Sequence, residues 1–186
     1  MRLLLTIPLL ALLLANCNPN PAPATAPQKT PADQQAIETR LLAELSPATD
    51  RAGRERNAII NRAIDRHYDL QAAPEGYFYE VLAAGDYQPL AEGDLITAHY
   101  RGNFLDGTVF DDSYQRGEAL RFTIGQLIPA WNLALLRVRP GASLRILTPS
   151  DLAYGADGLV NARGDTLVPA HAPLEFVISD ITIHEE

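Results

Sequence analysis

Five aromatic residues are the strongest candidates for chemistry in this chain. They fall on or beside segments that have the pattern of strands and of one short helix: Tyr100, Phe110, Trp131, Tyr154 and Phe176. On the concave side of a curved sheet they would form an apolar pocket able to hold a small ring. Aromatic residues on strands also form ordinary cores, so packing alone is the competing interpretation.

Composition argues against several other kinds of chemistry. The chain has 186 residues, of which 47% are hydrophobic and 20% charged, and this predicts one globular domain with extensions. Its net charge of −8 argues against nucleic acid as a partner, because phosphate backbones would repel it. The one cysteine, Cys17, allows no internal disulfide, and the one lysine, Lys29, lies in a proline-rich linker. A Schiff base or a P-loop would need a lysine in the folded part.

Candidate metal ligands are scattered along the chain. The four histidines lack the spacing of a zinc site: His67, His99, His171 and His184. A short acidic group could suggest calcium, but it lacks the EF-hand pattern: Asp106, Asp111 and Asp112. We therefore expect no metal and no cofactor.

The first residues have the pattern of an export signal. Residues 3–14 are apolar except for Thr6, and this run is shorter than the roughly 20 residues of a membrane-spanning helix. The following residues 14–17, Leu-Ala-Asn-Cys, resemble a bacterial lipobox, in which the cysteine is acylated. This predicts a lipoprotein signal peptide over 1–16, lipid attachment at Cys17 and a periplasm-facing place in the cell envelope. An ordinary signal peptide with an incidental cysteine is the alternative.

Two segments precede the main domain. Residues 17–32 are rich in proline and alanine, which predicts an extended tether. Residues 33–75 predict a helical extension, with helices over 33–45 and 50–70 whose apolar stripes include Ile37, Leu41, Ile60 and Ala63, with His67 as a further candidate. The charged residues of the second helix are expected on a solvated face: Arg51, Arg54, Glu55, Arg56, Arg62, Asp65 and Arg66. The extension either packs on the main domain as a cap or serves self-association or client binding.

Residues 76–186 change to a strand pattern. Alternating or branched apolar residues predict strands over 77–82, 95–101, 109–110, 120–124, 144–148 and 174–183. A turn at 105–108 carries an Asp-Gly pair, and a short helix is expected over 130–138. The fold class that follows is α+β: a curved antiparallel sheet wrapped around one short helix, preceded by the N-terminal helical extension.

Five motifs in this part, in order, resemble one enzyme family. They are ITAHYRG at 96–102, LDGTVFDDS at 105–113, GQLIPAW at 125–131, LAYG at 152–155 and VPAHAPLEF at 168–176. Together they resemble the FKBP-type peptidyl-prolyl cis-trans isomerases, and the helical part leading into them is similar to bacterial lipoprotein members of that family.

The resemblance implies a role for each matching position. It places Trp131 at the pocket floor, Asp111 at the mouth, and the Ile128 N–H and the Tyr154 hydroxyl as donors to the substrate backbone. The implied catalytic set is Tyr100, Phe110, Asp111, Ile128, Trp131, Tyr154 and Phe176, and the further substrate-binding positions are Arg116, Leu120, Leu127 and Val168.

The implied activity is cis-trans isomerisation of X-Pro bonds in exported polypeptides, through binding of the twisted amide. Proline-containing chains would be the partners, and the lipid anchor would hold the enzyme at the membrane. The alternative is an FKBP-like binding or chaperone module with little catalysis. It is favoured by departures from the family pattern, which are Ala130 in place of glycine, residues 132–134 after the tryptophan, and a long loop over 159–167.

Overall fold

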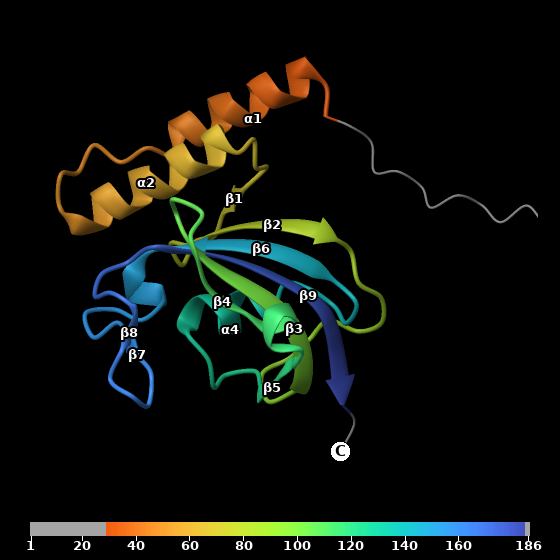
Figure 1. Ribbon diagram of the computed structural model, residues 1–186. Coiled ribbons are helices and arrows are strands. Elements are labelled where there is room, and N and C mark those ends of the chain that lie inside the picture. Colours follow the sequence, from red (N-terminus) through yellow and green to blue (C-terminus); the bar gives the residue numbers. More distant parts are fainter. Residues whose placement is uncertain (1–28, 185–186) are drawn as a thin grey trace, which may run out of the picture.

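The computed structural model describes residues 29–184, so the expected signal peptide, Cys17 and most of the expected tether lie outside the described residues. The described part begins with two helices, α1 (Pro31–Ala43) and α2 (Arg51–Asp65), which form a layer over one face of a sheet (Figure 1). Within residues 29–184, no helix combines the length and apolar character needed to cross a membrane.

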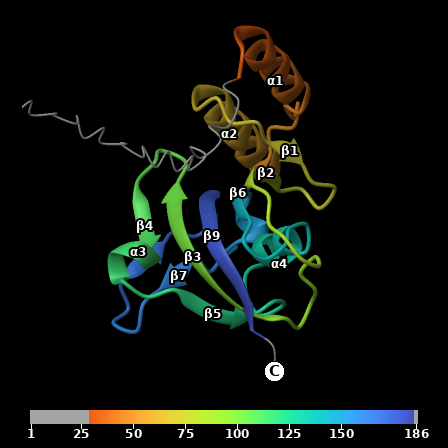
Figure 2. The same cartoon turned by 90° about the vertical axis from the view of Figure 1, so that its right-hand side faces the viewer.

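One curved antiparallel sheet forms the body of the protein. Its strands are β1 (Gln71–Ala72), β2 (Phe78–Ala83), β3 (Leu95–Phe104), β4 (Val109–Asp112), β5 (Leu120–Thr123), β6 (Ser143–Thr148) and β9 (Leu174–His184). The strand order is β1-β2-β6-β9-β3-β4, and β5 pairs with the first part of β3. Helix α4 (Pro129–Leu135) packs on the face opposite α1 and α2 (Figures 1 and 2). This confirms the predicted α+β fold.

Short elements complete the connections. Helix α3 (Ser113–Arg116) follows β4, and a single 3-10 turn, η1 (Ser150–Leu152), follows β6. The expected long loop over 159–167 instead contains a small hairpin of β7 (Leu159–Val160) and β8 (Thr166–Val168). Its turn carries Gly164 with φ of 88°, a backbone conformation that glycine adopts without strain.

The part of the sheet that α1 and α2 cover is buried on both faces, because side chains of its strands alternate between the two cores. In β6, Leu144 and Ile146 point into the main core with α4, whereas Leu147 points to the helix layer. Phe78 of β2 is opposite Leu147 in register and joins it beneath α2. Successive side chains of a strand face opposite sides, so one strand can serve two cores.

Local capping residues define where α1 and α2 begin, and a narrow apolar stripe packs the helices on the sheet. Thr30 and Asp33 form a capping box at the start of α1, and the Asp50 carboxylate accepts the Gly53 N–H at the start of α2. Ile59, Ile60 and Ala63 of α2 are fully buried, as is Leu41 of α1. This is the packing that the cap interpretation expects.

Three details of the predicted extension are wrong. The helices end earlier than expected, at Ala43 and Asp65, and His67 is an exposed residue with φ of 57° rather than part of the apolar stripe. Two charged residues also leave the expected solvated face, since Glu55 is only 6% exposed and Arg62 pairs with the buried Glu175. A charged side chain can be buried when it is paired, and both have partners far along the chain.

The shared core predicts that the helix layer and the sheet unfold together. Replacing Ile60 by alanine should lower the free energy of unfolding by about 2–5 kcal/mol, because a fully buried branched side chain leaves a cavity. Urea unfolding followed by far-UV and near-UV circular dichroism should show both signals shifting together. Leu42→Ala is the control, since Leu42 is 48% exposed on α1. A near-UV midpoint that stays at the wild-type value would mean that the layer unfolds alone.

Candidate active site

A cavity of about 360 Å³ opens between α4, β3 and the segment that follows β6. This volume is at the lower end of the range for small-molecule sites, which suits one ring and the backbone beside it. The lining residues come from five separate parts of the sequence: Tyr100, Leu120, Gln126, Leu127, Ile128, Trp131, Tyr154 and Phe176. The sheet and α4 therefore bring together side chains that are far apart along the chain.

Trp131 forms the floor and is held by its neighbours. It is 3% exposed and makes edge contacts with the rings of Tyr100, Phe122 and Phe176, at centroid distances of 5.1, 5.9 and 5.4 Å. Edge-to-face packing of this kind fixes both the position and the tilt of the indole. The buried indole N–H has no hydrogen-bond partner among the described residues. A bound group that offered an acceptor there would relieve the cost of that unpaired donor.

Phe110 packs behind Phe176, one of the residues that line the cavity. Its ring contacts Phe176 at 5.8 Å and Phe104 at 5.3 Å between centroids. The ring lies across the backbone of Gly102 in β3, where an added Cβ would come within 2.5 Å of Phe110 Cζ. Gly102 therefore makes room for Phe110. Gly102 lies one residue past the predicted strand over 95–101, so the sequence did not place it inside β3, where a glycine marks a close approach of this kind.

The segment before α4 carries a free backbone donor. Ile128 is the N-cap residue of α4, with a ψ of 146°. Within residues 29–184 its N–H donates to no protein acceptor. The Asn132 side chain accepts the N–H groups of Gly125 and Leu127 at 3.0 and 3.3 Å, and it donates to the Leu127 carbonyl at 2.7 Å. Asn132, a departure from the family pattern, thus holds the segment that lines the pocket.

Tyr154 supplies a second free donor. Its side chain lines the cavity, and its hydroxyl makes no hydrogen bond within the described part of the chain. Burial raises the pKa of Tyr154 above its ordinary value, so the phenol stays protonated at neutral pH. A protonated phenol can donate to a carbonyl.

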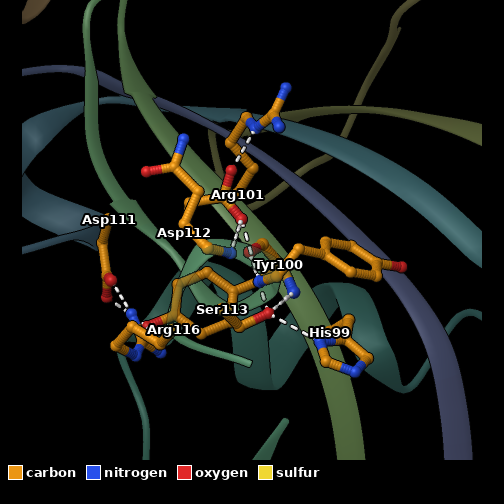
Figure 3. Close-up of polar contacts among 9 residues, drawn as sticks. His99, Tyr100, Arg101, Asp111, Asp112, Ser113 and Arg116 are labelled. Atoms are coloured by element: carbon orange, nitrogen blue, oxygen red, sulfur yellow. Dashed lines mark hydrogen bonds and ion pairs between the residues drawn. The ribbon is translucent and has the colours of Figure 1, made fainter. Parts of the chain in front are cut away.

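An acidic residue and an arginine hold the outer end of Tyr100. The Tyr100 hydroxyl donates to one oxygen of Asp111, and Arg116 donates to the other (Figure 3). The Arg116 guanidinium also lies 3.3 Å from the Tyr100 hydroxyl and 5.5 Å from the centre of its ring. This triad fixes Tyr100 at the mouth and neutralises the carboxylate.

A second polar group fixes the backbone behind Tyr100. The Tyr100 N–H donates to the fully buried Ser113 hydroxyl at 2.8 Å, and Nδ1 of His99 lies 2.9 Å from that hydroxyl (Figure 3). The neighbouring Asp112 caps α3 through the Tyr114 N–H and accepts Arg101 Nε at 2.7 Å. The sequence motif contained these residues, but their contact with Tyr100 depends on the β3–β4 pairing.

The acidic residues considered for calcium are occupied by protein donors. Asp106 accepts the Thr108 N–H, Asp111 binds Tyr100 and Arg116, and Asp112 caps α3. Over residues 29–184, no group of three or more His, Cys, Asp or Glu side chains is placed to hold a metal ion.

Most of the predicted site residues meet at the cavity. Seven line it directly, which are Tyr100, Leu120, Leu127, Ile128, Trp131, Tyr154 and Phe176. Phe110, Asp111 and Arg116 gather beside it around a neighbouring hollow. Val168 does not line the cavity, because it is buried in β8 opposite Leu159. Gln126 also lines the cavity, although no feature of the sequence pointed to that role.

The model of the FKBP-type peptidyl-prolyl cis-trans isomerase family matches residues 87–179, half of the chain. The chain belongs to this family. It is 32% identical over 157 residues to FkpA of Escherichia coli K12, covering 80% of this chain and 53% of FkpA. It is 43% identical over 95 residues to the peptidyl-prolyl cis-trans isomerase Mip of Coxiella burnetii, covering 51% of this chain and 41% of Mip. The chain thus spans about half the length of these curated relatives.

A solved structure gives the same result for the fold. The peptidyl-prolyl cis-trans isomerase of Pseudomonas syringae pv. tomato superposes with a TM-score of 0.60 at 26% identity, over 75% of this chain and 98% of that one. The FKBP family match begins at residue 87, so α1 and α2 lie outside it. The match to FkpA, over 157 residues, is longer than the β-rich part and therefore reaches into the helical extension.

The close approach at Gly102 predicts a coupled pair. Gly102→Ala should destabilise the protein by about 1–3 kcal/mol, because the new methyl group overlaps the Phe110 ring. The cost should nearly vanish in a Phe110→Ala background, where the ring is absent. Urea unfolding of the four proteins in the double-mutant cycle measures this coupling. An equal cost in both backgrounds would show that the strain has another source.

The charge of Asp112 predicts a pH-dependent contribution to stability. Burial disfavours the ionised carboxylate, but the hydrogen bonds from Arg101, Gln115 and Tyr114 more than offset this, and the pKa of Asp112 lies below its ordinary value. Its contribution is therefore present at pH values above the unfolded pKa of about 3.9 and is lost as pH falls through the folded pKa. Asp112→Asn keeps the cap and removes the charge, so it should be less stable than wild type at pH 7.

Thermal unfolding of wild type and Asp112→Asn from pH 7 to pH 2 should show their difference shrinking below about pH 4. Asp157→Asn is the matched control, since Asp157 is exposed and makes no hydrogen bond within residues 29–184. A constant difference across the pH range would contradict the role of the charge.

Proposed function

We propose that this protein is a peptidyl-prolyl cis-trans isomerase that accelerates rotation about X-Pro bonds by binding the twisted amide in its aromatic cavity. One observation carries the proposal. The cavity has an aromatic floor, Trp131, and two donors that have no acceptor among residues 29–184, the Ile128 N–H and the Tyr154 hydroxyl. The sequence relation to FKBP-type isomerases agrees with it.

The barrier to this reaction comes from amide resonance. The planar amide has partial double-bond character and separated charge, and its rotation barrier is about 18–20 kcal/mol. A twisted amide has lost that charge separation. An apolar cavity therefore disfavours the planar form more than the twisted form, and the difference lowers the barrier.

The two donors would add to this effect by holding the backbone on either side of the bond. They accelerate rotation only to the extent that they bind the twisted geometry better than the planar one. Each 1.36 kcal/mol of such preference gives about tenfold in rate. No bond to the substrate is made or broken, so the mechanism needs no nucleophile and no general base.

We propose exported polypeptides as the clients. The proposal rests on the export and lipidation pattern, with a signal peptide over 1–16, an acylated Cys17 and a tether over 17–32. The helical extension would then occupy 33–75, and the isomerase domain 76–186. Uncatalysed X-Pro isomerisation takes tens to hundreds of seconds, which is slow enough to limit folding after export.

The direct test is the cis-to-trans rate of an Ala-Leu-Pro-Phe peptide with residues 18–186. Wild type should give a clear enhancement. Trp131→Ala should lower kcat/KM by tenfold or more. Phe110→Ala should lower it by a smaller factor, because Phe110 does not line the cavity and only supports Phe176, which does. Tyr87→Ala is the control, because Tyr87 is 82% exposed and away from the cavity.

Circular dichroism must first show that each variant is folded. No enhancement from folded wild type would reject catalysis and leave a proline-binding or chaperone module. Equal activity in wild type and Trp131→Ala would reject this cavity as the site.

A further inference from the structure

The segment that carries Tyr154 depends on one serine. After β6 the chain makes the η1 turn, and the Ser150 carbonyl accepts the N–H groups of Ala153 at 2.9 Å and Gly155 at 2.8 Å. These two peptide groups flank Tyr154. The position of the Tyr154 side chain in the cavity therefore follows the position of Ser150.

Ser150 is held in turn by the helical extension. One oxygen of the Glu55 carboxylate accepts the Ser150 N–H at 2.7 Å, and the other accepts the Ser150 hydroxyl at 2.9 Å. Both residues are buried, and 95 residues of chain separate them. Figure 1 shows the beginning of α2 above the part of the chain that leads from β6 to β7.

A neighbouring cation, Arg51, offsets the cost of burying the Glu55 carboxylate. Arg51, one helical turn before Glu55, donates to Glu55 at 3.2 Å and to the Ser150 hydroxyl at 2.8 Å. It also binds both carboxylate oxygens of Asp151, at 2.9 and 3.2 Å. A buried charge is stable only when it is paired and hydrogen-bonded, and here the partners lie on α2 and on η1. The contact is thus a specific clamp between these two elements.

We infer that Glu55 is a positioning residue for catalysis, which sets the Tyr154 hydroxyl in the cavity by clamping Ser150 from α2. This inference rests on the proposed isomerase function. It assigns to the extension, which lies outside the matched FKBP region, a role in the chemistry of short substrates and not only in the binding of large clients.

The first experiment compares kcat/KM on the tetrapeptide. Glu55→Ala should lower kcat/KM by about tenfold, because the Tyr154 hydroxyl is then no longer held in position. Tyr154→Phe should lower it by a similar factor, because the hydroxyl itself is absent. The double variant should be no slower than Tyr154→Phe alone, since both changes act through the same group. Glu55→Gln, which can still accept the Ser150 N–H, should recover part of the rate.

Tyr68→Phe is the matched control. The Tyr68 hydroxyl also joins the extension to the sheet, since it donates to the buried Glu175 carboxylate at 2.9 Å, and within residues 29–184 it makes no hydrogen bond to residues 150–155. It should leave kcat/KM unchanged while removing one hydrogen bond of the same interface. The assay is run below the temperature at which any variant begins to unfold.

The second experiment needs no activity. Amide hydrogen exchange followed by NMR should show the Ala153 and Gly155 amides exchanging at least about tenfold faster in Glu55→Ala, with the amides of β6 unchanged. Tyr68→Phe should change neither. An inactive wild type would reject the proposed function, and the exchange data would still decide whether Glu55 clamps this segment.

Two results would overturn the inference. One is unchanged exchange at Ala153 and Gly155 in folded Glu55→Ala. The other is a loss of kcat/KM that is as large in the Tyr154→Phe background as in wild type, because Glu55 would then act by a route that does not include the Tyr154 hydroxyl.

Discussion

The first part of strand β9 buries side chains on both of its faces, and two different layers of the protein cover it. Phe176 points to α4 and forms a wall of the cavity, whereas its neighbour Glu175 points to the helix layer, and both are at most 2% exposed. A buried carboxylate needs partners, and Arg62 and Tyr68 of the extension supply them. One strand thus requires an aromatic core on one side and a polar, helical cover on the other.

Different interactions hold the two sides of the site. The floor and the Tyr100 wall are fixed by ring contacts and by the Asp111–Arg116 pair. Tyr154 lies on a turn whose anchor is a polar contact across the molecule, the Glu55–Ser150 pair. Apolar packing sets the shape of the cavity, and charge pairing sets the donor that faces it.

The sequence predicted what depends on local pattern or on family motifs. The alternation in residues 95–101 and 174–183 gave the two central strands, and the motifs led to Trp131, Ile128 and Tyr154 at one cavity. It could not predict features that depend on tertiary partners. Glu55 has the sequence environment of a solvated helix face, and its burial depends on Ser150, far along the chain, together with Arg51 on the same helix. The same holds for Gly102: only glycine fits there, because the Phe110 ring from the paired strand β4 occupies the space of a Cβ.

The chain contains a single tryptophan, and that residue is the floor of the cavity. Any group that enters the cavity must change the surroundings of this one indole, whose N–H has no acceptor among the described residues. Occupancy can therefore be followed from the intrinsic fluorescence of the unlabelled protein, with no background from a second indole. The same side chain that would shape the reaction is also a built-in optical reporter of it.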